Sequence, residues 1–201
     1  MNVVENQGKT LNEALEKVLI ELNANQSEVV YKSEEIEGKL FKSSSFLVSA
    51  VTKRELLNDM KKYLQTLVEG LGLKLEMETR LQDDTFYINM YSDNNPILIG
   101  KNGQTLKALE TLMKQKYLKD WNTFFKISLD VEDYKTKRVE YLEKLAIRIA
   151  KEVRDTKIDV ALDNMNSYER RIVHNKLTDF KGIKTTSEGE EPNRHIVIKA
   201  E

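Results

Sequence analysis

The chain has 201 residues, of which 40% are hydrophobic and 32% charged, and its formal net charge is −1. This balance is typical of a globular, water-soluble protein, and the length favours two or three small domains. The sequence has no cysteine, no apolar run near the ~20 residues that cross a bilayer and no signal peptide at its start. These absences exclude a disulfide scaffold and a cysteine-based zinc site, and we expect a cytoplasmic protein.

The first segment, about residues 1–52, is predicted to be a small acidic α+β domain. Thr10 has the position of an N-cap and Glu13 that of its capping-box partner, ahead of an amphipathic helix. The apolar residues of this helix recur at helical spacing, at Leu11, Ala14, Leu15, Val18, Leu19 and Leu22. Short strands are predicted at 28–31 and 46–52, with a turn in the polar stretch 42–45.

The second segment, about residues 53–132, has the predicted order helix, strand, strand, helix, helix, strand. Its elements are a helix at 54–70, strands at 73–81 and 85–91, a helical turn that ends at Gly100, a helix from Gln104, and a strand at 124–131. The helix from Gln104 is predicted to bury Leu106, Leu109, Leu112 and Met113.

The third segment, about residues 133–201, begins with a long amphipathic helix predicted at 134–156. A strand at 158–162 precedes a second helix, for which Asn166 is the predicted N-cap and Glu169 its capping-box partner. A polar loop at 187–194 and a strand at 195–199 follow. The pattern therefore predicts an α+β fold class made of three small domains of mixed helix and strand.

A Gly-x-x-Gly pattern, Gly100-Lys101-Asn102-Gly103, lies between the apolar turn at 97–99 and the start of a helix. Glycine lets a backbone approach a ligand closely, and a helix N-terminus attracts phosphate through its free N–H groups and its dipole. Lys101 adds a mobile positive charge at the tip. Many tight turns have the same pattern, so the surrounding elements decide its interpretation.

The order of elements around this loop, and the residues of 97–112, resemble the type II KH domain of bacteria. KH domains clamp about four nucleotides of single-stranded nucleic acid at their Gly-x-x-Gly loop. The resemblance implies that Gly100–Gly103 hold the sugar-phosphate backbone and that flanking apolar residues, Ile99 among them, form the base groove. Lys107 and Lys114, seven residues apart on the next helix, either follow the RNA or form an ordinary solvated face.

Arg170 and His174 are one helical turn apart, which places both side chains on one face of the helix that follows Asn166. An arginine fork suits phosphate, and a histidine can donate a hydrogen bond or stack on a base. In the alternative, structural interpretation, Arg170 pairs with an acid and His174 packs half-buried against the core. Arg194, in the polar loop, is either a further phosphate contact or part of a loop salt bridge.

The stretches 165–177 and 187–198 are similar to the Arg-x-x-x-His single-strand-binding domain. This resemblance implies that the nucleic acid is contacted by Arg170, Arg171, His174 and Arg194. Over nearly the entire chain, the three segments resemble the bacterial Jag family, also called KhpB or SpoIIIJ-associated proteins. Members join a Jag N-terminal domain (here 1–52), a type II KH domain (53–132) and an Arg-x-x-x-His domain (133–201).

The family resemblance implies a post-transcriptional RNA-binding regulator connected with the cell envelope or cell elongation. The implied partners are single-stranded RNA and a small KH-only protein, a homodimer stays open, and no cofactor or metal is expected. One stretch departs from the family pattern. The first domain of the family usually carries a Lys-Lys-Gly-Phe-Leu-Gly-type tip, whereas residues 37–43 read Glu-Gly-Lys-Leu-Phe-Lys-Ser, so the role of that tip is not carried over.

Charge is unevenly distributed along the chain, which bears on its partners. Residues 1–96 have 11 Lys and Arg against 16 Asp and Glu, and residues 97–201 have 21 against 17. A locally basic half can attract phosphate although the whole chain is nearly neutral. On the long helix, Lys137, Lys144, Arg148 and Lys151 fall along one side. They form either a solvated face or a stripe that follows a nucleic-acid backbone.

Catalysis is not expected, because the sequence has no nucleophile elbow, no phosphate-binding Gly-x-x-x-x-Gly-Lys-Ser/Thr motif and no recognisable acid–base pair. Two other interpretations stay open. The chain could be an adaptor whose acidic first domain docks on a membrane insertase or on division machinery, with peripheral membrane association through those partners. Its target could also be single-stranded DNA, since an Arg-x-x-x-His pair contacts phosphate and bases more than the sugar.

Overall fold

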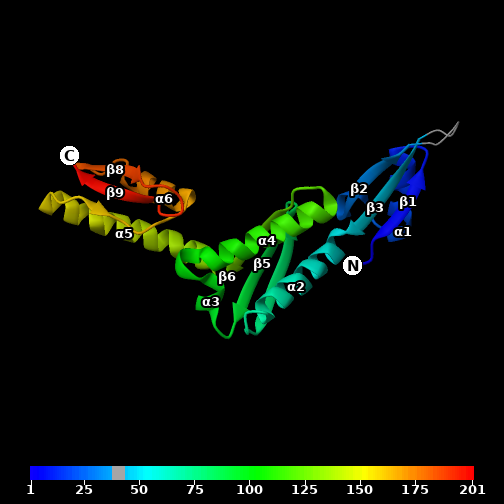
Figure 1. The fold of residues 1–201 in the computed structure, drawn as a ribbon, viewed down its shortest axis with the longest axis horizontal. Helices are drawn as coiled ribbons and strands as arrows, with labels where there is room; N and C mark the ends of the chain where they lie inside the picture. Colours follow the sequence, from blue (N-terminus) through cyan, green and yellow to red (C-terminus); the bar gives the residue numbers. More distant parts are fainter. Residues whose placement is uncertain (38–43) are drawn as a thin grey trace. The chain divides into compact units, whose positions relative to one another are not determined.

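A computed structural model describes residues 1–37 and 44–201 of the chain, which forms two compact units, Met1–Glu132 and Asp133–Glu201 (Figure 1). Unit 1 contains two three-stranded sheets and unit 2 contains one, each packed against helices. The predicted α+β class is therefore confirmed. Within the described ranges, none of the helices combines the length and apolar character that a membrane span requires.

The N-terminal part of unit 1 packs one helix on an antiparallel sheet of order β1-β3-β2. Its elements are β1 (Val4–Gly8), α1 (Leu11–Leu22), a short 3-10 turn (Gln26–Glu28), β2 (Val29–Ile36) and β3 (Ser45–Thr52). The core consists of Val4, Ala14, Leu15, Val18, Val48 and Ala50. Of the predicted turn at 42–45 and the predicted tip at 37–43, residues 38–43 lie outside the described residues.

Thr10 caps α1 as predicted, since its hydroxyl accepts a hydrogen bond from the Glu13 N–H at 3.2 Å. The Glu13 carboxylate reaches one residue further back than a capping box requires, and accepts from the Lys9 N–H at 2.8 Å. The sequence prediction missed β1, in which only Val4 and Gly8 are buried. This strand is defined by its pairing with β3 and has no apolar pattern of its own.

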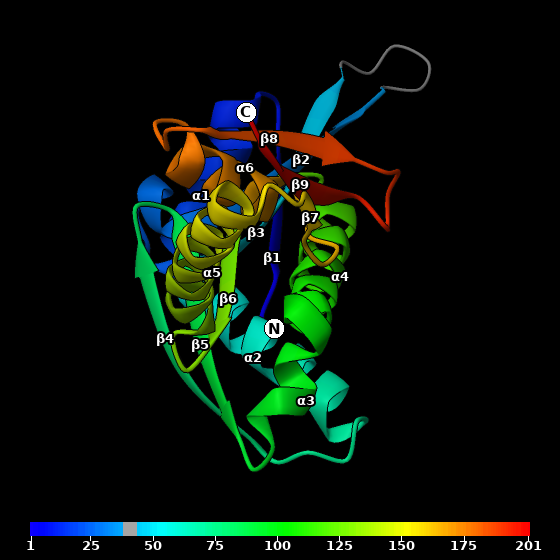
Figure 2. The ribbon, with the colours of Figure 1, turned by 90° about the vertical axis from the view of Figure 1, so that its left-hand side faces the viewer.

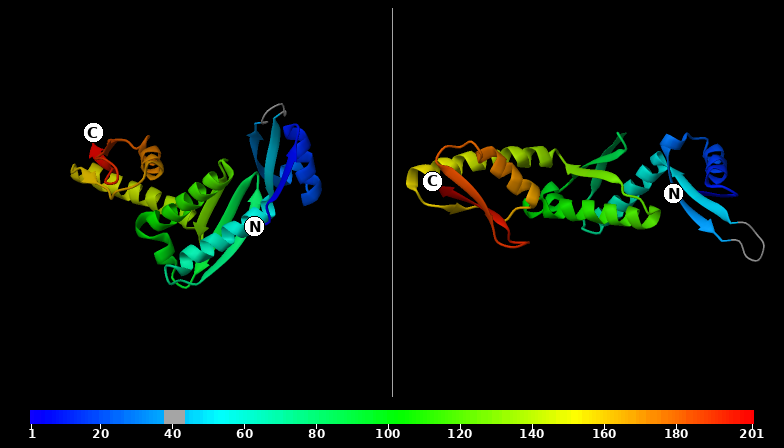
Figure 3. Two further views of the ribbon diagram at one scale, coloured as in Figure 1. Left: turned by 45° about the vertical axis from the view of Figure 1, so that its right-hand side comes forward. Right: turned by 90° about the horizontal axis from the view of Figure 1, so that it is seen from above.

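The C-terminal part of unit 1 has the order helix, strand, strand, helix, helix, strand that was predicted. The elements are α2 (Lys53–Glu69), β4 (Leu75–Gln82), β5 (Thr85–Ser92), α3 (Asn95–Ile99), a 3-10 turn (Lys101–Gly103), α4 (Gln104–Trp121) and β6 (Lys126–Val131). In the sheet β4-β5-β6, β4 pairs antiparallel and β6 parallel with the central β5. Helices α2 and α4 pack side by side on one face, where the Tyr117 hydroxyl donates to Asp59 at 2.9 Å (Figure 1 and Figure 3).

One core prediction for α4 is wrong: the Leu112 side chain is 48% exposed. The buried line of α4 runs through Leu106, Leu109, Met113 and Tyr117, with spacings of three and four residues. At about 100° per residue, Leu112 lies roughly 105° away from the middle of this line. The helix itself was predicted correctly, but it buries a narrower face than the distribution of its apolar residues suggests.

Unit 2 packs two helices on one face of an antiparallel sheet of order β7-β9-β8 (Figure 2). Its elements are α5 (Tyr134–Thr156), β7 (Val160–Ala161), α6 (Ser167–Leu177), β8 (Ile183–Glu188) and β9 (His195–Ala200). Helix α5 has the predicted ends, and Asn166 with Glu169 forms the predicted capping box of α6. The strand predicted at 158–162 is only two residues long, and β8 was not predicted.

Candidate nucleic-acid interface

The Gly100–Gly103 loop has a backbone that only glycine and a few polar residues adopt easily. Gly100 has φ 71° and ψ 178°, Asn102 has φ 52° and Gly103 has φ 77°. A Cβ on Gly100 would collide with the side chain of Thr105 and lie 2.9 Å from its backbone nitrogen. Since L-residues avoid positive φ, apart from asparagine and aspartate in the left-handed region, the motif is required by this local geometry.

The loop is held between two anchored helices. On the α3 side, Leu98 is fully buried and the Gly100 N–H donates to the Pro96 carbonyl at 2.8 Å. On the α4 side, the N-cap is Gly103, which has no side chain to cap the helix. The start of α4 therefore offers its positive dipole end to a ligand at the loop, which favours an anion such as phosphate.

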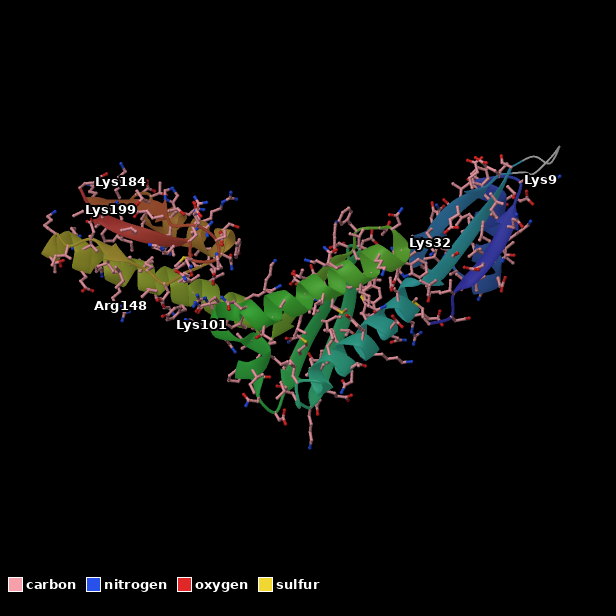
Figure 4. The ribbon with its side chains drawn as sticks, in the orientation of Figure 1. Lys9, Lys32, Lys101, Arg148, Lys184 and Lys199 are labelled. Atoms are coloured by element: carbon pink, nitrogen blue, oxygen red, sulfur yellow. The ribbon has the colours of Figure 1, made fainter. Side chains whose placement is uncertain are left out.

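The side chains around this loop differ in how available they are. Lys101 and Lys107 are exposed, whereas Ile99 and Asn102 are partly buried. Figure 4 shows Lys101 next to α4, on the loop that precedes the helix. Lys114 forms an ion pair with Glu110 at 2.6 Å, which favours its interpretation as part of an ordinary helix face.

In unit 2, Arg170 is nearly buried and already has two partners. Its Nη1 donates to the Met165 carbonyl at 2.7 Å and forms an ion pair with Glu191 at 3.0 Å. The Arg170 side chain is 10% exposed and that of Glu191 is 62% exposed. Arg170 therefore ties the start of α6 to the polar loop, and the acid pairing that the sequence left open is present.

His174 and the two neighbouring arginines are more accessible than Arg170. His174 is exposed, and its Nδ1 lies 2.6 Å from the Thr185 hydroxyl on β8. Arg171 is exposed on the same helix. The exposed Arg194 donates from Nε to the Ser187 hydroxyl at 3.1 Å and, in the part of the chain that the structure describes, forms no ion pair. These side chains can donate hydrogen bonds to phosphate or to base edges.

A buried ion pair that the sequence prediction missed fixes α6 against α5. The Glu169 Oε1 accepts from the Arg138 Nε at 2.8 Å, while its Oε2 accepts from the Asn166 N–H at 3.0 Å. The side chains of Arg138 and Glu169 are only 16% and 7% exposed. The capping box pointed to Glu169, but the 31 residues that separate it from Arg138 gave no local signal.

Comparison with known families and proteins agrees with this architecture. Residues 140–200 match the family model of the R-3-H domain, which is named for its Arg-x-x-x-His spacing, and this range includes Arg170, His174 and Arg194. Unit 2 thus contains a domain of the Arg-x-x-x-His class.

Two relatives match nearly the whole chain. It is 34% identical over 203 residues to "RNA-binding protein KhpB" of Clostridium symbiosum, covering 98% of this chain and 91% of the relative. It is also 34% identical over 204 residues to the protein of the same name in Bacillus subtilis strain 168, covering 98% of both. A shorter match, 32% over 136 residues, covers 68% of this chain and 42% of the Lactiplantibacillus plantarum protein of that name. The chain belongs to the KhpB (Jag) family.

Proposed function

We propose that this chain binds single-stranded RNA at two places, the Gly100–Gly103 loop of unit 1 and the α6 surface of unit 2. The observation that carries the proposal is the backbone of the loop, where positive φ angles precede a helix start whose N-cap is a glycine without a side chain. The full-length relatives support it, because they are named RNA-binding proteins and their names describe no enzyme.

At the loop, Gly100 and Gly103 let the sugar-phosphate backbone come close to the start of α4, and Lys101 pairs with a phosphate. Asn102 donates from its amide, Ile99 borders the bases and Lys107 follows the strand along α4. The exposure of Lys101 and Lys107 supports these roles, as does the positive end of the helix beside the loop.

At the α6 surface, Arg171, His174 and Arg194 contact the nucleic acid directly, since all three are exposed. Arg170 acts differently, because its guanidinium is engaged with Glu191 and the Met165 carbonyl. It holds the loop that carries Arg194, and it meets a phosphate only when Glu191 moves aside.

We extend the proposal to the biological role. The chain acts in the cytoplasm as a post-transcriptional regulator connected with the cell envelope or cell elongation. Its protein partners are a small KH-only protein, a second copy of the chain and, through the acidic N-terminal part, a membrane insertase.

The test replaces Lys101 and Asn102 by aspartate and measures binding of a labelled 24-nucleotide RNA by fluorescence anisotropy and ultraviolet crosslinking. Aspartate tolerates the left-handed backbone of position 102, so the fold is expected to stay intact while binding is lost. The control is Asn58→Glu with Lys62→Glu on the exposed side of α2, which changes the charge by the same amount. Binding that survives in the loop variant would refute the loop assignment, and an equal loss in the control would assign the effect to net charge.

Two further comparisons separate the proposal from its alternatives. A competing DNA strand of the same sequence should displace the RNA poorly, and equal competition would make single-stranded DNA an equal target. Purification of the chain from cells should recover RNA with it. If membrane proteins are recovered in place of RNA, and the loop variant recovers them equally, the adaptor interpretation replaces ours.

A further inference from the structure

The solvent-facing side of α5 combines positive charge with an exposed aromatic ring. The helix buries Leu142, Ala146, Ala150 and Val153 on one line. At about 100° per residue, the line opposite to these residues passes through Lys144, Arg148 and Lys151, with Lys137 and Tyr141 within roughly 40–50° of it. In Figure 4, Arg148 lies on the side of α5 away from β9.

Three cations of this face, Lys144, Arg148 and Lys151, are little neutralised by the protein itself. Among the described residues, Arg148 and Lys151 form no ion pair, and Lys144 reaches Glu140 only at 3.7 Å, with both side chains mostly exposed. An acid on the same line, Asp155, is engaged by its neighbour Arg154 at 3.2 Å. A net positive stripe along the helix therefore faces the solvent.

Tyr141 is 53% exposed, although a tyrosine ring is usually placed where much of it is covered. Its ring is held from one side, because the centre of the Arg138 guanidinium lies 5.5 Å from the ring centroid. Arg138 is in turn fixed by its ion pair with the buried Glu169. The ring is thus positioned in advance with part of its surface open, next to the cations.

We propose that this face of α5, named here the α5 ridge (Tyr141, Lys144, Arg148 and Lys151), is a further contact surface for single-stranded RNA. A base stacks on Tyr141 while the three cations neutralise phosphates of the same strand, the combination by which proteins hold single strands without reading their sequence. The helix rises by about 15 Å from Tyr141 to Lys151, enough for a few nucleotides of an extended strand. The inference rests on the proposed RNA binding and adds a surface to it.

The experiment uses the full chain and a 24-nucleotide single-stranded RNA of mixed sequence, titrated at several salt concentrations. Replacing Lys144, Arg148 and Lys151 by glutamine preserves helix propensity. The slope of log K against log salt should then fall by about 2, at roughly 0.7 for each phosphate that is no longer neutralised. The matched control replaces Lys9, Lys32 and Lys62 by glutamine and should keep the wild-type slope.

The ring is tested separately from the charges. Tyr141→Ala should weaken binding about 5- to 150-fold, the range for losing one stacked base, whereas Tyr141→Phe should keep the wild-type affinity. Phe124→Ala, which removes an 88% exposed ring from unit 1, should have no effect. Crosslinked peptides from the wild type should include Tyr141.

The outcomes distinguish this inference from the proposed function. Suppose that the α5 variants keep the wild-type affinity and slope while the Lys101/Asn102 variant loses binding. The α5 ridge is then not a contact surface for RNA, and the proposed RNA binding at the loop is retained. If the Lys101/Asn102 variant still binds and the ridge variants do not, the loop assignment is wrong and the ridge carries the binding. A wild-type chain that binds no RNA overturns both.

Discussion

Replacing Arg138 by methionine is expected to lower the free energy of unfolding of unit 2 by about 3 kcal/mol. Removing one partner of a buried ion pair costs roughly 3–5 kcal/mol, because the other charge stays buried without compensation. The value belongs at the lower end here, since the Glu169 carboxylate keeps its bond from the Asn166 N–H. For a unit of this size, the change corresponds to a fall in Tm of about 12–24 °C.

Two spectroscopic signals of the full chain separate the units in this assay. Trp121 is the only tryptophan and is 3% exposed in the core of unit 1. Its fluorescence therefore follows the unfolding of unit 1, while far-ultraviolet circular dichroism follows the helices of both units. The Arg138 variant should shift part of the dichroism transition to lower temperature and leave the fluorescence transition unchanged.

The double variant Arg138→Met with Glu169→Gln tests the cause. It has no buried unpaired charge, and a glutamine can still accept from the Asn166 N–H, so most of the lost stability should return. Lys144→Met on the exposed side of the same helix should stay within about 0.5 kcal/mol of the wild type. A double variant as unstable as the single one would refute the unpaired charge as the reason for the loss.

Three more outcomes are expected. Gly100→Ala should destabilise unit 1 by about 3 kcal/mol, because the added Cβ strains the backbone and overlaps with the following helix; unfolding is followed by tryptophan fluorescence. The control, Gly72→Ala, lies at positive φ but has open space around it, so it should cost only about 1–2 kcal/mol. Thr185→Val removes the hydroxyl beside His174 and should weaken RNA binding a few-fold, with a Tm change below about 10 °C. A hydrogen bond from the Lys53 ammonium holds the pKa of Asp84 below its ordinary value of 3.8. The ion pair between Lys53 and Asp84 therefore stabilises unit 1 fully above pH 3.8, and this stabilisation is lost as the pH falls through the lowered pKa of the folded state. Asp84→Asn should therefore remove one component of acid destabilisation, seen as a flatter pH dependence of unfolding.

The elements that the sequence predicted well are those whose pattern is local. Helix α5 was predicted with its observed ends, because its apolar residues recur over 23 residues. Strands β1 and β8 were missed for the opposite reason. β8 has a single buried residue, Ile183, and exists because it pairs along its full length with β9. Such a strand is specified by its neighbour in the sheet, so a single sequence carries little sign of it.

The same distinction applies to the candidate site. The glycine loop could be predicted from the local sequence, because positive φ angles before a helix start favour glycine and asparagine within four consecutive residues. Helical spacing also put Arg170 and His174 on one face of α6. Their partners, Glu191 and Thr185, come from the polar loop and from β8, and no helical periodicity points to residues that far along the chain.

These partners give the residues of the Arg-x-x-x-His motif a structural role in this fold. The residues of α6 reach three other parts of unit 2: Glu169 contacts α5, Arg170 contacts the polar loop and His174 contacts β8. Replacing Arg170 therefore leaves the Met165 carbonyl and Glu191 without their donor, and it disturbs the loop that carries Arg194 together with any contact to RNA. The Arg194 side chain is exposed and, among the described residues, is bonded to the Ser187 hydroxyl alone, so it can be changed without that structural loss. For this reason Arg194→Gln separates binding from folding in unit 2, whereas Arg170→Ala mixes the two.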